Sequence, residues 1–421
     1  MRKNRFFRMA IFAILGLGLI LSGCNSENEP ERVVPNMRES IELNTDTRSA
    51  ANELKDFYVQ FTTDAVKYAA SQTDIDNVIV SPVSAAILLS MIANGVDADT
   101  QKEITDYLGV TDLSALNTLS NILLTELPKV DNQADFGLAN SIWINSTYAT
   151  LTPAYTNLMK SDYMADVRYE KFNDDAKLLK KINDWCSDKT NGQIKTMPTQ
   201  LSSDQLAILL NAMKFKGVWE EKTFLKENTI KETFHGASRV NNVEMMHSPH
   251  KDRYYAADDN FELFHLDFGN SAFYFTVVLP NENLSLTDAN ELLTAQEIRK
   301  LQKEAVRCQL EVYLPKFKVN SKLKLDNVLT AGQLAGLKGT MAFNMFEPHQ
   351  TGQIEFNQAS SLDIDETGAI GASVSSGELI AYAPEIIPGG EYTVKVNRPF
   401  YFFIREISTG ACILSGRISD L

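Results

Sequence analysis

The stretch DETGAIGASVSSGELIAYAPEIIPGG, Asp365–Gly390, has the composition of a flexible linker, yet only residues 391–421 follow it. Linkers of this composition usually join domains. The residues that follow are apolar and alternate in the manner of strands, and a segment that short cannot build a core of its own. We therefore interpret Asp365–Gly390 as part of the folded domain that precedes it.

This stretch also alternates in a way that suits a strand, because successive side chains of a strand point to opposite faces of its sheet. One row of alternate positions carries only very small side chains: Ala369, Gly371, Ser373, Ser375 and Gly377. The interleaved row is larger and partly polar: Ile370, Ala372, Val374, Ser376 and Glu378. The pattern predicts a segment that is exposed but could be buried as a strand, with its small row against a packed core.

The rest of residues 51–421 reads as one α+β domain, with helices early and mostly antiparallel strands later. Apolar residues at helical spacing predict a helix over 51–70, and NVIVSPVSAAILLSMIANG (Asn77–Gly95) predicts a short strand followed by a buried helix. Long apolar runs predict strands at 136–146, 206–219, 261–268, 272–280 and 308–319. Three more strands are expected within 392–421, with a turn at Ser408–Gly410.

The first residues have the pattern of an export signal. Arg2, Lys3, Arg5 and Arg8 precede the apolar run Met9–Leu21, which is too short to span a bilayer. The run ends in LSGC, which resembles the lipobox of bacterial lipoproteins, so Cys24 is the expected lipidation site. The predicted organisation is a lipoprotein signal peptide (1–23), a lipidated cysteine with a disordered tether (24–50) and a single domain (51–421).

Charge and motifs argue against nucleic-acid binding and against catalysis. The net charge is −14, whereas binding to phosphates needs a basic surface. The common hydrolase, nucleotide-binding and metalloprotease motifs are missing from the sequence. We interpret His247 and His250 as solvated histidines of a polar connection, and DIDE (Asp363–Glu366) as alternation at a strand end. Cys186, Cys308 and Cys412 are expected to be buried free thiols. No enzyme activity, metal or cofactor is expected.

The segments that frame Asp365–Gly390 identify the chain as a member of the serpin family. ETGAIGAS (Glu366–Ser373) resembles the hinge of the serpin reactive loop. Six further segments resemble serpin sequence in order and spacing: NVIVSPVSAAILLSMIANGVDADTQKEI (77–104), FGLANSIWI (136–144), INDWCSDKTNGQI (182–194), LLNAMKFKGVW (209–219), VYLPKFKV (312–319) and NRPFYFFIREISTGACILSGRI (397–418). The resemblance covers nearly all of residues 51–421. It implies three β-sheets surrounded by eight or nine helices, with an exposed reactive loop near the C-terminus.

The resemblance also implies a mechanism, that of a suicide-substrate inhibitor of serine endopeptidases, with cysteine endopeptidases as a further target class. A protease would cut the loop and form its acyl-enzyme. The freed loop would insert into the main sheet as an extra strand and trap that covalent complex. The alternative within the same fold is a non-inhibitory serpin that acts as a binding or structural surface lipoprotein. A surface lipoprotein enzyme is a third reading, which no residue set supports.

The implied site residues fall into four groups. The hinge comprises Glu366, Thr367, Gly368, Ala369, Ile370, Gly371, Ala372 and Ser373. A polar group that would control opening of the sheet comprises Ser81, Ser84, Asn211 and Gln358, where Gln358 replaces the usual histidine. Trp219 matches the tryptophan near the point where the loop inserts. The family spacing counted from Glu366 places the cut bond between Tyr382 and Ala383.

Counting back from Pro399 gives Pro388 instead, so Leu379, Ile380, Ile386 and Ile387 remain alternatives for the residue before the cut. No Lys or Arg lies between Ser376 and Tyr392, so the expected targets are chymotrypsin-, elastase- or subtilisin-like. The partners expected are target endopeptidases in a covalent acyl complex and a membrane reached only through the lipid. We expect an exported monomer anchored to a bacterial membrane, at the outer membrane or cell surface.

Overall fold

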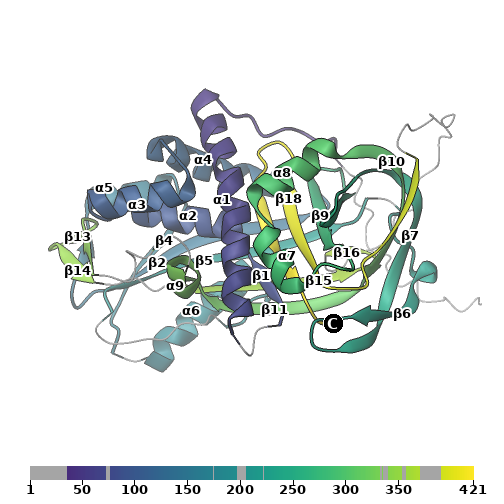
Figure 1. The fold of residues 1–421 in the computed structure, drawn as a ribbon. Helices are drawn as coiled ribbons and strands as arrows, with labels where there is room; N and C mark the ends of the chain where they lie inside the picture. Colours follow the sequence, from purple (N-terminus) through teal and green to yellow (C-terminus); the bar gives the residue numbers. More distant parts are fainter. Residues whose placement is uncertain are drawn as a thin grey trace, which may run out of the picture. The chain divides into compact units, whose positions relative to one another are not determined.

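The computed structural model describes residues 36–72, 76–173, 175–196, 205–220, 222–331, 334, 340–352, 357–369 and 390–421. The helices of this part of the chain are α1 (Thr45–Ala70), α2 (Pro82–Ala93), α3 (Ala98–Leu108), α4 (Leu113–Glu126), α5 (Pro153–Ser161), α6 (Asp175–Lys189), α7 (Leu286–Leu292), α8 (Ala295–Glu304) and α9 (Leu325–Ala331), with 3-10 turns η1 (Leu127–Lys129) and η2 (Lys226–Asn228). Most of the helices precede residue 190 and most of the strands follow it, as predicted (Figure 1).

A six-stranded sheet has the order β11-β15-β16-β5-β2-β4. Its strands are β11 (Phe317–Lys324), β15 (Asn357–Asp365), β16 (Gly368–Ala369), β5 (Ala207–Val218), β2 (Asp135–Asn145) and β4 (Asp166–Glu170). The neighbours β2 and β5 are antiparallel over a long register, from Asp135 opposite Lys216 to Ile144 opposite Ala207. The very short β16 lies between β15 and β5 and is antiparallel to both.

A nine-stranded sheet has the order β1-β19-β18-β9-β8-β7-β10-β17, and β6 pairs with β7 off this path. Its strands are β1 (Val78–Val80), β19 (Cys412–Ile418), β18 (Phe400–Glu406), β9 (Phe273–Pro280), β8 (Phe261–Asp267), β7 (Val240–Ala257), β10 (Val306–Pro315), β17 (Glu391–Lys395) and β6 (Ile230–His235). Two further strand pairs join β12 (Met341–Phe343) to β14 (Gln350–Gly352) and β13 (Phe346–Glu347) to β3 (Thr150–Leu151).

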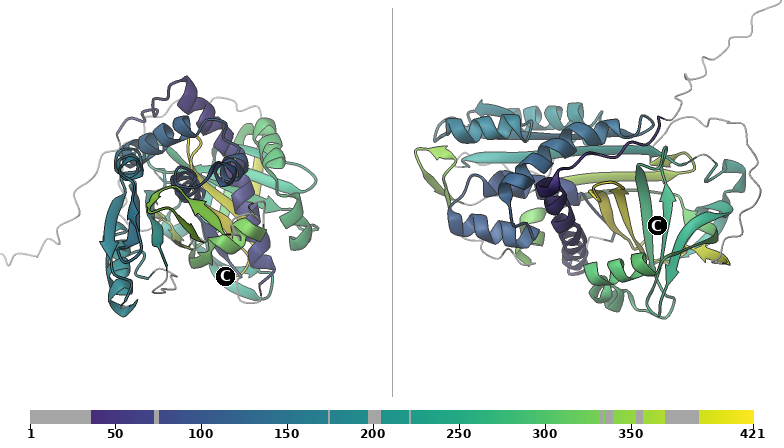
Figure 2. Two further views of the ribbon diagram at one scale, coloured as in Figure 1. Left: turned by 90° about the vertical axis from the view of Figure 1, so that its left-hand side faces the viewer. Right: turned by 90° about the horizontal axis from the view of Figure 1, so that it is seen from above.

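The helix α2 lies in the centre of the molecule because it is apolar on every side. All twelve of its residues are buried, and it packs against β5 of one sheet and β19 of the other. The long helix α1 crosses in front of it and packs on α4, α9 and β19 (Figure 1). On the opposite side α6 covers β2 and β5 and closes a smaller core around Trp143, Trp185 and Cys186. Figure 2 shows the helices as layers over the strands.

The α+β fold class is confirmed, and the predicted strands are found with one exception. The run 308–319 is not one strand, because β10 ends at Pro315 in the nine-stranded sheet and β11 begins at Phe317 in the six-stranded sheet. His247 and His250 lie on β7 rather than on a polar connection. The register of β7 with β10 shifts next to Pro249, and proline is tolerated at such a bulge.

The predicted disordered tether 24–50 is wrong over residues 36–50. Helix α1 begins at Thr45, where Asn44 caps it by accepting a hydrogen bond from the Thr47 amide. Ile41 and Leu43 are buried, and the Ile41 amide donates to Ser408 Oγ at 3.0 Å. This segment therefore belongs to the folded unit, because its apolar side chains are buried. The sequence analysis missed it because the neighbouring residues are polar. Residues 1–35 lie outside the described part of the chain.

Candidate functional site

The predicted hinge begins inside the six-stranded sheet. Asp365 ends β15, the chain turns through Glu366 and Thr367, and Gly368 and Ala369 form β16 between β15 and β5. In the register, Gly368 lies opposite Asp365 on one side and Val218 on the other. The first two residues after the turn thus already occupy a strand position between two long strands. If the following residues continued β16, they would extend this same strand between β15 and β5.

Trp219 follows the last residue of β5 and holds the turn of the hinge. Its indole Nε1 donates to the Asp365 carbonyl at 2.8 Å, and its main-chain amide donates to the Thr367 carbonyl at 3.0 Å. The indole ring stacks on Phe268, with ring centroids 4.4 Å apart and planes at 9°. Trp219 is 4% exposed. The turn is therefore bonded to a residue that is itself fixed in the core.

Glu366 is bonded to two residues that lie between elements, Thr229 before β6 and Lys316 between β10 and β11. Its carboxylate accepts a hydrogen bond from Thr229 Oγ1 at 2.6 Å and forms an ion pair with Lys316 at 3.1 Å. Burial opposes ionisation, but the bonds from Thr229 and Lys316 outweigh it, so the pKa of Glu366 lies below its ordinary value. Lys316 occupies the single position between β10 and β11. The hinge is thus anchored where the chain crosses between the two sheets.

Gly368 is required by the geometry of this site. Its φ of +134° is one that side-chain-bearing residues rarely adopt, and a Cβ built on it would lie 2.1 Å from the Gly217 carbonyl oxygen. A side chain at this position would force β16 away from β5. The predicted hinge motif therefore needs glycine at this position, because the backbones of β16 and β5 approach each other too closely for a side chain.

Three of the four residues in the predicted polar group form one hydrogen-bonded cluster beneath the six-stranded sheet. Gln358, on β15, accepts from the Ser81 amide at 2.8 Å and donates to the Ser81 carbonyl at 3.1 Å. Ser81 Oγ donates to Ser84 Oγ at 2.8 Å and also caps α2. All three residues are at most 7% exposed. The Gln358 amide thus bonds both the main-chain amide and the main-chain carbonyl of Ser81, and that carbonyl also accepts from the Ala85 amide at 3.1 Å.

The fourth residue, Asn211, does not join this cluster. It lies opposite Asn140 on β2, and its Nδ2 donates to Asn140 Oδ1 at 2.7 Å. Its own Oδ1 is buried and finds no partner among the described residues. The prediction of one four-membered group is therefore corrected to two groups, Ser81–Ser84–Gln358 and Asn211–Asn140. The reason is that the Asn211 amide bonds within the β2–β5 pair, whereas Gln358 on β15 bonds to the start of α2.

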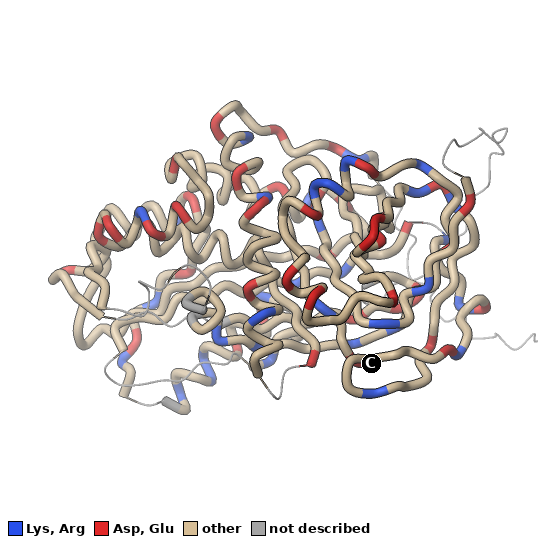
Figure 3. Tube along the Cα trace, viewed as in Figure 1, with Lys and Arg blue, Asp and Glu red and all other residues tan. Residues whose placement is uncertain are grey.

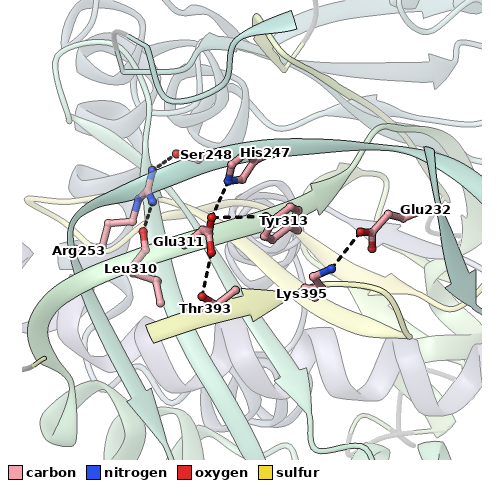
Figure 4. Close-up of polar contacts among 9 residues, drawn as sticks. All are labelled: Glu232, His247, Ser248, Arg253, Leu310, Glu311, Tyr313, Thr393 and Lys395. Atoms are coloured by element: carbon pink, nitrogen blue, oxygen red, sulfur yellow. Dashed lines mark hydrogen bonds and ion pairs between the residues drawn. The ribbon is translucent and has the colours of Figure 1, made fainter. Parts of the chain in front are cut away.

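The C-terminal end of the loop is held by a cluster that the sequence analysis missed. We call it the β17 clamp: Glu232, His247, Glu311, Tyr313, Thr393 and Lys395 (Figure 4). Glu311 on β10 accepts from Thr393 Oγ1 at 2.9 Å on one side and lies 2.8 Å from His247 Nε2 on the other. Burial raises the pKa of Glu311, but the bonds to His247 and Thr393 lower it by more than burial raises it. The pKa of Glu311 therefore lies below its ordinary value. The sequence signal available for this cluster was that Glu311 and Tyr313 lie two residues apart in a predicted strand and so share one face of it.

Several predicted site residues lie outside the described part of the chain, namely Ile370, Gly371, Ala372, Ser373, Tyr382, Ala383 and Cys24. Cys186, Cys308 and Cys412 are buried free thiols, as predicted. In the described ranges no group of three or more His, Cys, Asp or Glu side chains could hold a metal ion. No helix of the described residues is long and apolar enough to span a membrane. Figure 3 shows positively and negatively charged residues interspersed along the described elements.

Comparison with known proteins places this architecture in one family. Residues 57–421 match the sequence model of the family described as Serpin (serine protease inhibitor). Human Serpin I2 is 25% identical over 356 residues, which cover 82% of this chain and 86% of that protein. The fold matches the thermophilic serpin tengpin in its native state, with a TM-score of 0.75, 24% identity, and coverage of 92% of this chain and 97% of tengpin.

A further structural neighbour is human thyroxine-binding globulin in complex with thyroxine, with a TM-score of 0.76 and 20% identity over 88% of this chain and 99% of that chain. At such identities the structural likeness concerns the fold alone, and the family model carries the assignment. The α+β architecture with the hinge beside β5 defines a serpin-type fold. The chain belongs to the serpin family of serine protease inhibitors.

Proposed function

We propose that this serpin is a suicide-substrate inhibitor of endopeptidases. The protease serine attacks the carbonyl carbon of the residue before the cut, and the amine of the next residue leaves with a proton. The acyl ester remains on the protease while the freed loop extends β16 between β5 and β15. Transport of the tethered protease distorts its active site before water can complete hydrolysis.

One observation carries this proposal. Gly368 and Ala369 already lie antiparallel to both β15 and β5, in the strand position that the inserted loop would occupy. Residues 369–382 would make a strand about 45 Å long at about 3.3 Å per residue. Each new backbone hydrogen bond contributes about 1 kcal/mol, and a full ladder is large beside ordinary stabilities of about 5–15 kcal/mol. The uncut form is accordingly metastable.

The two buried polar groups support a role in opening the sheet. If β16 is extended, β5 and β15 must separate along the part of the sheet beyond Ala369. Asn211 lies on β5 and Gln358 lies on β15. Gln358 binds the peptide of Ser81 at the start of α2, so it fastens β15 to the central helix. Asn211 fastens β5 to β2 instead. In this arrangement the Asn211 amide bonds β5 to β2, while Gln358 bonds β15 to the start of α2.

The proposed targets prefer apolar or aromatic residues before the cut, with Tyr382–Ala383 as the bond attacked. The segment between Ser376 and Tyr392 has no Lys or Arg, so the specificity pocket of a trypsin-like protease has no charged partner there. Chymotrypsin-, elastase- and subtilisin-like enzymes accept such residues. Leu379, Ile380, Ile386 and Ile387 are the alternative residues before the cut.

The test is to mix the purified protein with chymotrypsin, elastase, subtilisin, trypsin and a papain-like protease. The expected result is a complex with at least one of the first three that survives boiling in detergent, and a released fragment that begins at Ala383. Cleavage without such a complex would support the alternative, a non-inhibitory serpin. That alternative has a precedent in the fold, because thyroxine-binding globulin is found in complex with thyroxine. A stable complex with trypsin alone would contradict the proposed specificity.

For its location, we propose export, lipidation at Cys24 and anchoring of a monomer at a bacterial outer membrane or cell surface. The supporting observation is the sequence of residues 1–24, with its positive start, short apolar run and LSGC motif. Metabolic labelling with a radioactive fatty acid tests this directly. Label in the wild type but not in Cys24→Ser is expected, and equal labelling of both would contradict it.

A further inference from the structure

The chain enters the described fold through a segment that lies against its surface, residues 36–44, ahead of α1. Ile41 and Leu43 are buried, and the Ile41 amide donates to Ser408 Oγ in the turn between β18 and β19 at 3.0 Å. Closer to the N-terminus, the Arg38 guanidinium donates to the Ser271 carbonyl in the turn between β8 and β9 at 3.3 Å. Figure 1 shows this segment in purple, running from the start of α1 across the top of the molecule. It therefore follows a defined path from α1 to the β8–β9 turn.

Asn36 fixes the point at which the chain meets this surface. Its main-chain amide donates to Asn132 Oδ1 at 3.1 Å, and the Asn132 amide donates back to Asn36 Oδ1 at 2.9 Å. Asn270 Nδ2, in the β8–β9 turn, donates to the same Asn36 Oδ1 at 3.1 Å. Asn36 is thus bonded to two separate segments of the fold. The domain itself sets the place from which the preceding residues leave it.

The β8–β9 turn also borders the entry of the reactive loop. The Gly269 amide, next to Asn270, donates to the Val218 carbonyl at 2.7 Å, and Val218 lies opposite Gly368 in the register of β5 with β16. Paired residues of neighbouring strands have Cα atoms about 5 Å apart and consecutive Cα atoms are about 3.8 Å apart, so Asn36 and Gly368 lie within about 20 Å of each other. The N-terminal segment and the reactive loop therefore meet the fold at the same end of β5.

The opposite end of β5 is the end towards which loop insertion would carry a protease. In the register Ala369 lies opposite Gly217, and β16 runs antiparallel to β5. If β16 were extended without a shift of register, Leu379 would lie opposite Ala207, the first residue of β5. A strand from 369 to 379 spans about 33 Å. Insertion would thus move the attached protease away from Asn36, along the length of the sheet.

The chain between the expected lipidation site and Asn36 is short. Asn36 follows Cys24 by 12 residues, and a chain of that length spans at most about 43 Å in any conformation. A lipid on Cys24 would therefore keep Asn36 within about 43 Å of the bilayer, with the loop entry close to it. A protease domain of about 240 residues is roughly 45 Å across. The space between the bilayer and this end of the fold holds about one such domain.

We propose that the anchored inhibitor acts on endopeptidases held at the same membrane surface, because its loop-bearing end is the end that the tether keeps near the bilayer. This inference rests on the proposed function and on lipidation at Cys24. A protease held at that surface meets the loop at a high effective concentration. A free protease must reach a loop that the bilayer shields from about half of the directions of approach. Insertion then draws the trapped protease towards the far end of β5.

The test attaches the processed chain, residues 24–421, to phosphatidylcholine vesicles at either end of the fold. Maleimide lipid couples the unlipidated chain at Cys24 alone, because Cys186, Cys308 and Cys412 are buried. Chymotrypsin is added free in solution or is held on the same vesicles by a short linker. The rate of covalent complex formation is measured in both cases, and the rate with vesicle-held chymotrypsin is divided by the rate with free chymotrypsin.

The matched control attaches the far end of the fold instead. It combines Cys24→Ser with Thr147→Cys, because Thr147 is exposed and follows β2 just beyond the pair of Ile144 with Ala207. Without vesicles, this variant should form the covalent complex at the rate of the wild type. Should it prove unstable, Ser146→Cys, at the neighbouring exposed position, replaces it.

The chain held at Cys24 is expected to react with free chymotrypsin at least about twofold more slowly than the same chain in solution. The chain held through Thr147→Cys should react as fast as in solution. At equal surface density, the ratio of the two rates is expected to be at least about tenfold larger for attachment at Cys24 than for attachment through Thr147→Cys. Equal ratios, or a larger ratio for Thr147→Cys, would overturn the proposal.

Failure of the underlying proposals gives different results. If no chain forms a covalent complex with any protease, the suicide-inhibitor function fails, and the same ratio measured for cleavage of the loop then decides which end faces the membrane. If fatty-acid labelling finds no lipid on Cys24, the anchoring fails, and the inference is overturned with it whatever the ratio. A lipid on Cys24 together with the larger ratio for that attachment supports it.

Discussion

The indole Nε1 of Trp219 donates a hydrogen bond of 2.8 Å to the main-chain carbonyl of Asp365, the last residue of β15. The bond crosses from the end of β5 to the turn that opens the reactive loop. It joins two strands that must separate further down if the loop is to insert. The turn therefore stays closed while the strands beyond it remain free to part.

Trp219→Phe removes this donor and keeps an aromatic ring for the stack on Phe268. We expect a loss of about 1 kcal/mol in the free energy of unfolding, and a larger fraction of protease turning the loop over as substrate. Urea unfolding and the ratio of complex to cleaved product measure the two effects. The control is Trp185→Phe, which removes a comparable bond to Asp166 away from the hinge. An equal change in that ratio for both variants would show that the effect is not local.

Gly368→Ala tests the close approach of β16 to β5. Because of the positive φ and the contact with the Gly217 carbonyl, we expect a loss of about 1–3 kcal/mol in stability. Gly352→Ala is the matched control, since a Cβ there would meet its nearest atom at an ordinary 3.4 Å. The measurement is urea unfolding of both variants. Equal, small changes would mean that β16 is not seated as described.

Gln358→Leu leaves the buried amide of Ser81 without a partner, while the Ser81 carbonyl keeps its bond from the Ala85 amide. An unpaired buried group costs about 1–3 kcal/mol, so we expect the uncut form to lose about that much. The half-buried Gln350, which makes only one bond of 3.5 Å to the Tyr148 carbonyl, provides the control as Gln350→Leu, and we expect that change to alter the unfolding free energy by no more than about 0.5 kcal/mol. A Gln358→Leu variant as stable as the control would remove Gln358 from the sheet-opening group.

Glu366 predicts a dependence of stability on acid pH. Its pKa is lowered in the folded protein, so its stabilising effect is complete above the ordinary value of about 4.3 and is lost as pH falls through the folded value. The melting temperature of the wild type should therefore fall more steeply below that pH than that of Glu366→Gln. The exposed Glu347 serves as the control as Glu347→Gln. Parallel curves for wild type and Glu366→Gln would refute the ion pair with Lys316.

The sequence predicted most of the fold because its strands are long and strongly apolar. Periodicity does mark a change at Lys316, because the buried positions are even-numbered from Cys308 to Leu314 and odd-numbered from Phe317 to Leu323. The interpretation of 308–319 as one strand overlooked this shift of phase. Periodicity could not reveal the burial of Ile41 and Leu43, two apolar side chains among polar neighbours, because that burial depends on long-range packing such as the contact of the Ile41 amide with Ser408.

For the site, the hinge glycine and Trp219 were predicted through resemblance to a family, and the structure supplies their contacts. The polar group was predicted as one set because resemblance to a family does not show which partner each side chain bonds. The clamp on β17 was missed because Glu311, Thr393 and His247 come from three separated segments and form no motif. Contacts of that kind become visible only when the strands are paired.

The central claim is that the uncut protein is metastable and relaxes when its loop is cut. The most direct measurement is the melting temperature of the protein before and after a single cut in the loop, with the fragments kept together. A marked rise in melting temperature after the cut is predicted, because the ladder between β5 and β15 is then completed. A cut protein that melts at or below the temperature of the intact protein would contradict the account.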